Sequence, residues 1–177
     1  PLARSLASCE NYYAQWGELW ERLMLIKARP IAGDAELGAE FIETVQPFRY
    51  PRSLSEAALA EMGELKRLIE EQAVREGELH RNVKLGRGGI REVEFIAQTL
   101  QLLHAGRQPF LQNTQTLPTL ERLAQYGHLP EADTTALADA YIFLRDVEHR
   151  LQMENNLQTH TVPEDRPDRE RLAHLMG

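Results

Sequence analysis

The fold is decided by one stretch of the sequence, Asn82-Val83-Lys84-Leu85-Gly86-Arg87-Gly88-Gly89-Ile90-Arg91-Glu92-Val93-Glu94-Phe95. Here a short segment of alternating apolar residues runs through three glycines into residues with the periodicity of a helix. Glycine permits positive φ and close backbone approach, so the cluster predicts a sharp turn. A helix that begins at such a turn leaves its first N–H groups without helical partners, and these could hold an anion. Arg87 and Arg91 would add two guanidinium groups to that anion site.

The same stretch has a simpler interpretation. The turn would then only dock one helix against the next, and Arg91 would pair with a neighbouring carboxylate. The glycine spacing is not a full phosphate-binding fingerprint, so both interpretations stay open. Glu92 and Glu94 stand two positions apart on a helix and point to different sides, which argues against a two-carboxylate metal site. We predict no metal ligand and no catalytic residue in this chain.

Composition limits the class of protein. The 177 residues carry a formal net charge of −7, with 42% hydrophobic and 27% charged residues, which is ordinary for a globular protein. The acidic balance argues against a nucleic-acid partner. The single cysteine, Cys9, excludes a disulfide framework and a cysteine metal site, and it fits a reducing, cytoplasmic location. Apolar runs are too short to cross a membrane.

Apolar residues recur at helical spacing along most of the chain, which predicts an all-α fold. The expected helices cover residues 2–27, 35–45, 56–76, 89–104, 116–124, 131–153 and 169–176. Val83 to Leu85 could be extended. We therefore predict a bundle of about six to seven amphipathic helices with at most one very short strand near Val83–Leu85.

Individual residues predict where these helices begin and end. Asp34, Ser53 or Ser55, and Thr116 are expected as N-caps, since their side-chain oxygens can accept a hydrogen bond from a free N–H group. Gly106 is expected as a C-cap, with Pro109 shortly after it. The proline- and aromatic-rich segment from Gln46 to Arg52 is expected to connect two helices without being helical itself.

Several motifs then follow one another in order: Trp20-Glu21-Arg22-Leu23, Ile26 to Asp34, Pro47-Phe48-Arg49-Tyr50-Pro51, Lys84 to Gln98, Leu117-Pro118-Thr119-Leu120, and Tyr141-Ile142-Phe143-Leu144-Arg145 with Glu148. Together they resemble the glutamine-synthetase adenylyltransferase family, whose helical domain is shared with the PII uridylyltransferases. The resemblance covers nearly the whole chain. The Gly-Gly-Ile-Arg-Glu-Val-Glu form at 88–94 is most similar to the amino-terminal, adenylyl-removing half of that family.

The resemblance implies a bifunctional parent nucleotidyltransferase that regulates nitrogen assimilation. One half attaches AMP from ATP to a tyrosine of glutamine synthetase, and the other removes it by phosphorolysis, which yields ADP. The parent would use Mg²⁺ and ATP or ADP, and its partners would be glutamine synthetase and the PII protein. Such enzymes hold Mg²⁺ with an Asp-x-Asp pair and a third carboxylate. This sequence has no Asp-x-Asp, so we expect a piece of a larger enzyme that is inactive alone.

The resemblance also implies a division of the chain and two possible roles. Residues 1–52 would follow the nucleotidyltransferase core, and residues 53–177 would form a helical bundle with the glycine turn and helix 89–104. In the first role the bundle supports or caps the active site, and phosphate of AMP or inorganic phosphate meets cationic groups of the turn. The candidate contacts are Gly86, Arg87, Gly88, Gly89 and Arg91. In the second role the domain is a regulatory or structural module that contacts glutamine synthetase or PII, and the glycines serve packing only.

A further set of residues is expected to face the adjoining nucleotidyltransferase core in cis. Trp20, Arg22, Lys27 and Arg29 would form an aromatic and basic patch on the first helix. Low exposure of Trp20 and Arg22 would contradict this interpretation. A free-standing helical interaction module outside the family is the remaining alternative.

Overall fold

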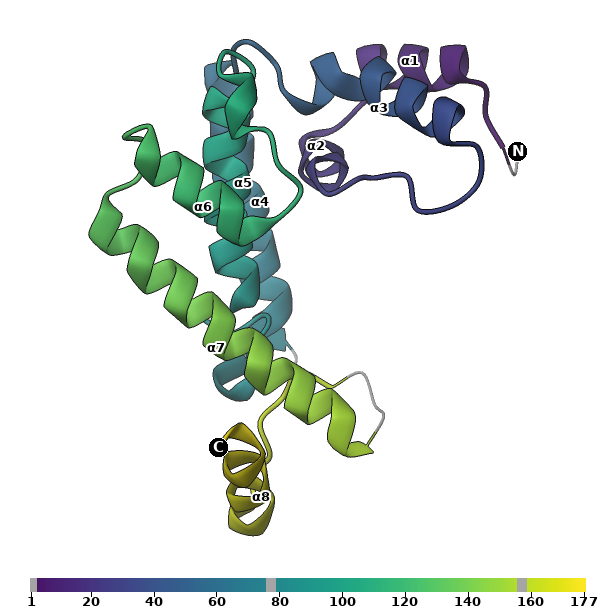
Figure 1. Ribbon diagram of the computed structural model, residues 1–177. Helices are drawn as coiled ribbons and strands as arrows, with labels where there is room; N and C mark the ends of the chain where they lie inside the picture. The colour runs from purple at the N-terminus through teal and green to yellow at the C-terminus, as the bar shows by residue number, and fades with distance from the viewer. Residues whose placement is uncertain (1–2, 76–78, 156–158) are drawn as a thin grey trace. The chain divides into compact units, whose positions relative to one another are not determined.

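The computed structural model describes residues 3–75, 79–155 and 159–177 (Figure 1). Eight α-helices and two short 3₁₀ helices lie in these ranges: α1 Leu6–Gln15, α2 Leu19–Ile26, α3 Ala35–Arg49, α4 Glu56–Arg75, η1 Leu79–Arg81, α5 Ile90–His104, η2 Pro109–Leu111, α6 Thr116–Gln125, α7 Glu131–Asn155 and α8 Arg166–Met176. These ranges hold no strand, only a single antiparallel bridge between Asn82 and Thr161. The all-α prediction is confirmed, with more α-helices than expected. None of the helices in the described ranges has the length and apolar character needed to cross a membrane.

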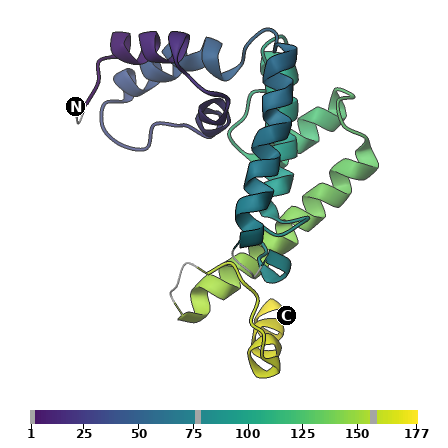
Figure 2. The same cartoon turned by 180° about the vertical axis from the view of Figure 1, so that it is seen from behind.

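The chain divides into two compact units. Unit 1 comprises Pro1–Gly63 and Ala97–His128, and unit 2 comprises Glu64–Ile96 and Leu129–Gly177. The limits of the units fall within α4 and within α5, both of which can be followed from behind in Figure 2. The predicted division is a different one: residues 1–52 would follow a nucleotidyltransferase core, and residues 53–177 would form a helical bundle. It depends on where that core lies, so it stays a prediction.

The prediction of a single long helix over 2–27 is wrong, because the helix is interrupted between α1 and α2. Trp16 closes α1 by donating its N–H to the Tyr12 carbonyl at 2.7 Å. A Cβ on Gly17 would lie 2.4 Å from the Phe48 ring, so the backbone passes directly over that ring. Glu18 and Glu21 then form a capping box that begins α2. The break therefore follows from a tertiary contact with α3.

Helix α3 begins where the sequence predicts and ends later. Asp34 caps it by accepting hydrogen bonds from the N–H groups of Glu36 and Leu37. The predicted connector at 46–52 is wrong in its first half, because the helix continues through Pro47 to Arg49. Phe48 is buried against Leu25, Val45 and Tyr13, and this packing outweighs the one backbone hydrogen bond that proline removes.

Helix α4 is capped by Ser55, whose hydroxyl accepts from the Ala58 N–H at 3.1 Å. Of its expected apolar face, Met62 is buried and Leu68 is half exposed. The other predicted positions lie outside the described residues or their described side chains: Leu59, Leu65, Ile69 and Glu76.

The second half of α5 packs with η2 and α6 in unit 1. Leu102, Leu111, Leu120 and Leu123 are fully buried there. Buried Gln101 donates to the carbonyls of Leu111 and Asn113, both at 2.9 Å, and thereby holds the loop between η2 and α6.

Two expected caps in this region have other roles. Thr116 is the first residue of α6 and is buried, and its hydroxyl accepts from Lys27 Nζ at 2.9 Å instead of capping the helix. Gly106 is not in the left-handed region. A Cβ on it would lie 2.0 Å from the Pro51 carbonyl oxygen, so the glycine permits close backbone approach.

Unit 2 is built on α7 and α8. Val147 and Leu151 of α7 pack with Leu172 of α8, and Val83 and Val162 cover this cluster. Asp165 caps α8 by accepting from the Asp168 N–H. The predicted long helix at 131–153 and the last helix are thus both confirmed, each slightly longer than expected.

Gly106→Ala is expected to destabilise the protein, because its methyl group meets backbone and one segment must move. We expect a loss of about 1–3 kcal/mol in the free energy of unfolding, measured by chemical denaturation. Gly63→Ala is the control, since no described atom lies within 4 Å of a Cβ there. In the middle of α4 that change should stabilise by about 0.5–1 kcal/mol. Equal changes in the free energy of unfolding for Gly106→Ala and Gly63→Ala would contradict the close approach of Gly106 to the Pro51 carbonyl.

A histidine pair makes unit 1 sensitive to pH. The rings of His104 and His128 stack with centroids 3.9 Å apart. Burial, and secondarily the charge of His128, lower the pKa of His104. The unfolded chain therefore binds more protons than the folded chain near this pKa, and the free energy of unfolding falls as pH falls below about 7.

We expect His104→Asn to reduce the loss of stability between about pH 7.5 and about pH 5.5 relative to the wild type. Denaturant melts at both pH values measure this difference. His174→Asn, at an exposed position on α8, is the control. A wild-type chain whose stability rises on acidification over this interval would contradict the assignment.

Candidate functional site

The glycine turn in unit 2 is held by one asparagine. The Asn82 side-chain oxygen accepts from the N–H groups of Lys84 and Leu85 at 3.0 and 2.9 Å, and its carbonyl accepts from the Gly86 N–H at 2.8 Å. Val83 donates its N–H to the His160 carbonyl at 2.9 Å. The turn is therefore fixed both locally and to the segment before α8.

The three glycines of the turn are needed for different steric reasons. A Cβ on Gly86 would lie 2.4 Å from the Asn82 carbonyl oxygen, and one on Gly89 would lie 2.7 Å from the Gly86 carbonyl oxygen. Gly88 has a φ of 75°, in the left-handed region that favours glycine. The predicted sharp turn is confirmed, and its geometry excludes larger residues.

The N–H groups at the start of α5 are not free, contrary to the sequence-based expectation. Gly88 donates to a Glu92 carboxylate oxygen at 2.8 Å and Gly89 to the Gly86 carbonyl at 2.8 Å. The next two donors, Ile90 and Arg91, reach the carbonyls of Val83 and Lys84, both at 3.0 Å. The turn itself supplies the partners that a bound anion would otherwise supply, so these four N–H groups are not the free donors expected from the sequence.

The two arginine side chains remain available. Arg87 and Arg91 are both exposed, and neither guanidinium has a hydrogen bond or an ion pair to a described residue. The neighbouring carboxylate expected for Arg91 in the simpler interpretation is therefore not found in the described part of the chain. Two unpaired cations at the start of a helix are suited to an anionic ligand.

A pocket lies beside the turn. Its volume is about 490 Å³, within the range of small-molecule sites. Val83, Leu144 and Val162 contribute apolar walls, and Arg87 lines it together with the glycines of the turn. Arg81, also in the lining, is engaged with the Val162 carbonyl and with Glu164.

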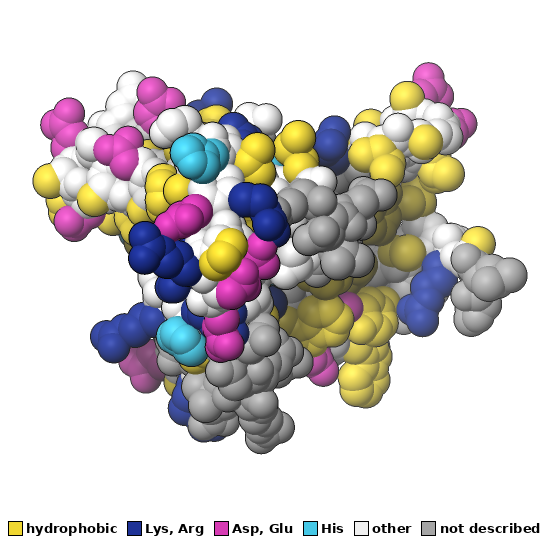
Figure 3. Space-filling model, turned by 90° about the horizontal axis from the view of Figure 1, so that it is seen from below, with side chains coloured by type: hydrophobic (Ala, Val, Ile, Leu, Met, Phe, Trp, Pro, Cys, Tyr) yellow, Lys and Arg dark blue, Asp and Glu magenta, His cyan; other side chains and the backbone are white. Residues whose placement is uncertain are grey.

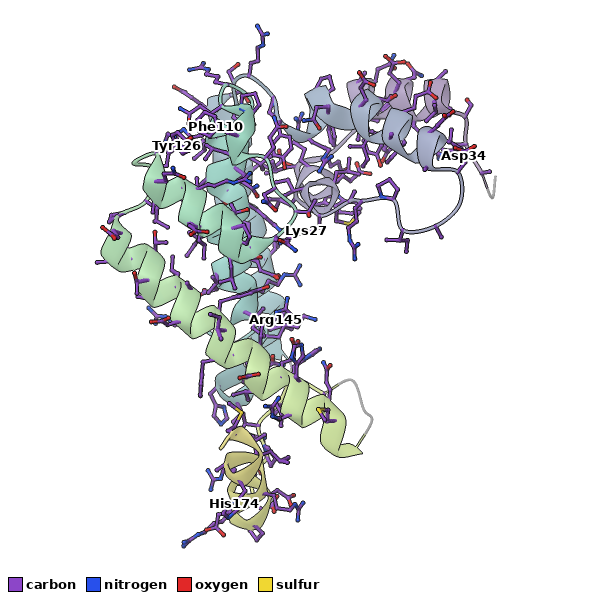
Figure 4. All side chains as sticks on the ribbon, viewed as in Figure 1. Lys27, Asp34, Phe110, Tyr126, Arg145 and His174 are labelled. Atoms are coloured by element: carbon purple, nitrogen blue, oxygen red, sulfur yellow. The ribbon has the colours of Figure 1, made fainter. Side chains whose placement is uncertain are left out.

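Behind the turn lies a network of charges centred on Arg145 of α7, which is labelled in Figure 4. Its guanidinium contacts Glu94 of α5 at 2.8 Å and Glu148 at 2.7 Å. Tyr141 donates its hydroxyl to the same Glu94 oxygen at 3.0 Å and accepts from Arg145. Burial alone would lower the pKa of Arg145, but the hydrogen bonds with Tyr141 and Glu148 raise it, so the guanidinium stays charged.

Glu148 is the buried member of this network. Only 4% of its side chain is exposed. Besides Arg145, its carboxylate lies 2.9 Å from His160 Nδ1 and 4.0 Å from Lys84 Nζ of the turn. One carboxylate thus joins α7, the segment before α8 and the glycine turn, while Arg145 extends the connection to α5.

Sequence reasoning did not assign roles to these residues. Glu94 was considered only as half of a metal pair, whereas it pairs with Arg145. A signal was present, because Tyr141, Arg145 and Glu148 are spaced four and three apart, which places them on one helix face. Among the described residues, no three His, Cys, Asp or Glu side chains are arranged to hold a metal ion.

The four predicted interface residues of α2 and its end do not share one environment. Trp20 is 45% exposed, and its ring N–H donates to Glu18. Arg22 is half-buried over the Phe48 ring and donates to the Phe48 carbonyl. Lys27 contacts Thr116, and Arg29 is exposed. Trp20 and Arg29 are accessible to a partner, whereas Arg22 and Lys27 already have contacts in unit 1.

Family models match both ends of the chain. The model described as GlnD PII-uridylyltransferase matches residues 63–177, which include the glycine turn and the charge network. The chain belongs to this family. A second model, glutamate-ammonia ligase adenylyltransferase, matches residues 1–44. Membership excludes an unrelated free-standing helical module.

Individual relatives agree with the second model. Proteins from Xanthobacter autotrophicus and Rhizobium meliloti are each 45% identical to this chain over 99% and 100% of its length, and one from Hahella chejuensis is 44% identical over 99%. All three are named bifunctional glutamine synthetase adenylyltransferase/adenylyl-removing enzyme. The chain spans about a fifth of their length, 18% of each.

Glu148→Gln is expected to cost about 3 kcal/mol in the free energy of unfolding, because it removes the buried negative charge that pairs with Arg145 and Lys84. Chemical denaturation at neutral pH measures this loss. Glu164→Gln is the control: it removes an exposed partner of Arg81 and should cost less than about 1 kcal/mol. Equal losses in the two variants would contradict a structural role for the buried network.

Proposed function

We propose that this chain is the helical domain of a bifunctional glutamine synthetase adenylyltransferase/adenylyl-removing enzyme. The observation that carries the proposal is 45% identity, over essentially the whole chain, to relatives with that name. In the parent, one reaction transfers AMP from ATP to a tyrosine of glutamine synthetase. The other removes it by phosphorolysis and yields ADP. The match of the glycine turn favours the adenylyl-removing half.

The chain's own residues support the chemistry without performing it. Phosphoryl transfer in this class needs carboxylates that hold Mg²⁺, and the residues present do not fit that ion: the sequence lacks Asp-x-Asp, and the described side chains form no metal cluster. Mg²⁺ and the nucleotide would be held by the adjoining core. The domain would cap that site in the cytoplasm, in an enzyme that regulates nitrogen assimilation.

Within this role, Arg87 and Arg91 would contact the phosphate of AMP or inorganic phosphate, beside Gly86, Gly88 and Gly89. Both guanidiniums are exposed and unpaired among the described residues, and the adjacent pocket can take a small ligand. Phosphorolysis brings two phosphate groups together, so cationic side chains would stabilise its transition state.

A second function has its own support. All four N–H groups from Gly88 to Arg91 have partners within the turn and α5, as expected if the glycine turn has a purely structural role. The domain would then be a regulatory module that contacts glutamine synthetase or PII, with no role at the nucleotide. Trp20 and Arg29 would face the adjoining core in either case.

The test is Arg87→Ala and Arg91→Ala in the full-length parent. We expect AMP removal to fall at least about tenfold in kcat/KM, about 1.4 kcal/mol of transition-state stabilisation, with an unchanged melting temperature. Arg169→Ala, an exposed arginine of α8, is the control. Unchanged AMP removal in both variants would favour the structural module.

The isolated chain should bind AMP or inorganic phosphate weakly or not at all by calorimetry, because the core would supply most contacts. Tight binding to these 177 residues would contradict the view that the nucleotide site lies elsewhere in the parent.

A further inference from the structure

Two aromatic rings lie together on the surface of unit 1. Phe110 of η2 and Tyr126, the C-cap of α6, have ring centroids 3.9 Å apart. They are 42% and 47% exposed, and both are labelled in Figure 4. Aromatic rings gain free energy when they are covered. A half-exposed pair of tilted rings therefore offers area that a partner can bury.

Three arginines lie at the same end of unit 1. Arg122 donates to the Phe110 carbonyl at 2.8 Å. Arg107, three residues before Phe110, donates to the Arg52 carbonyl, also at 2.8 Å. Carbonyl oxygens orient a guanidinium but do not neutralise it. No carboxylate among the described residues forms an ion pair with Arg52, Arg107 or Arg122, so no salt bridge neutralises these three guanidiniums.

Packing beneath these residues keeps them in place. The His104 and His128 rings stack, and His128 Nε2 lies 2.6 Å from Gln108 Oε1. The backbone N–H groups of Arg107 and Gln108 both reach the His104 carbonyl. We call the surface group the cationic aromatic patch, defined as Arg52, Arg107, Phe110, Arg122 and Tyr126.

This patch gathers cations without ion pairs on an acidic chain. The net charge is −7, and Arg145, Arg166 and Arg171 of unit 2 pair with carboxylates. On the face seen in Figure 3, basic and acidic side chains are interspersed. A local excess of positive charge on an acidic protein selects an acidic partner.

The composition of the patch indicates a protein partner. Tyrosine, phenylalanine and arginine are the residues enriched at the centres of protein–protein interfaces. We infer that the cationic aromatic patch docks an acidic surface of the protein substrate, which under the proposed function is glutamine synthetase.

The test uses the full-length parent and steady-state removal of AMP from adenylylated glutamine synthetase. Arg107→Glu and Tyr126→Ser change exposed side chains outside the glycine turn. Each should raise KM for glutamine synthetase about tenfold with kcat unchanged, because docking is lost while the chemistry is retained. Added salt should raise the wild-type KM by screening the arginines. Arg169→Glu, a charge reversal elsewhere, should leave KM unchanged.

The outcomes separate this inference from the proposed function. If the wild type acts on glutamine synthetase and both variants keep its KM, the docking inference is overturned and the proposed function stands. If the wild type does not act on glutamine synthetase, both fall. Should Arg107→Glu lower the melting temperature, Arg107→Gln replaces it in the comparison. If RNA competes with glutamine synthetase, or if the chain self-associates and the variants abolish this, the patch binds a different partner and the inference is overturned.

Discussion

The arrangement of unit 2 depends on one buried carboxylate. Glu148 is removed from water, and it is tolerable there only because Arg145, His160 and Lys84 surround it. Removing charges from water costs several kcal/mol per ion, so the network gives little net stability, and losing one member costs much more than the intact pair contributes. The network instead favours one arrangement of unit 2, because any packing that separates these groups leaves a charge buried and unpaired.

Much of this fold can be predicted from apolar spacing, because most helices are amphipathic and carry their own caps. Asp34 and Ser55 cap α3 and α4 as expected, and α5 and α7 have nearly the expected limits. The failures have a common cause. The break at Gly17 depends on a ring of α3, and Gly106 faces the carbonyl of Pro51. Contacts between distant residues leave no mark on local periodicity.

The glycine turn was predictable in position but not in detail. The turn and its two exposed arginines follow from glycine clustering and from the charge of nearby side chains. Whether the N–H groups of the turn are free depends on where Asn82 and Glu92 direct their side-chain oxygens, which a sequence does not specify. The role of Glu94 was also missed, since its partner Arg145 is 51 residues away.

The self-contained hydrogen bonding of the glycine turn has a consequence for ligand recognition. Because Asn82, Glu92 and nearby carbonyls already satisfy the backbone, the loop keeps its shape whether or not anything is bound. Ligand binding would then cost conformational entropy only in the side chains of Arg87 and Arg91. Under the proposed role of Arg87 and Arg91, selectivity could therefore change through these two side chains alone, while the turn that presents them keeps its backbone hydrogen bonds.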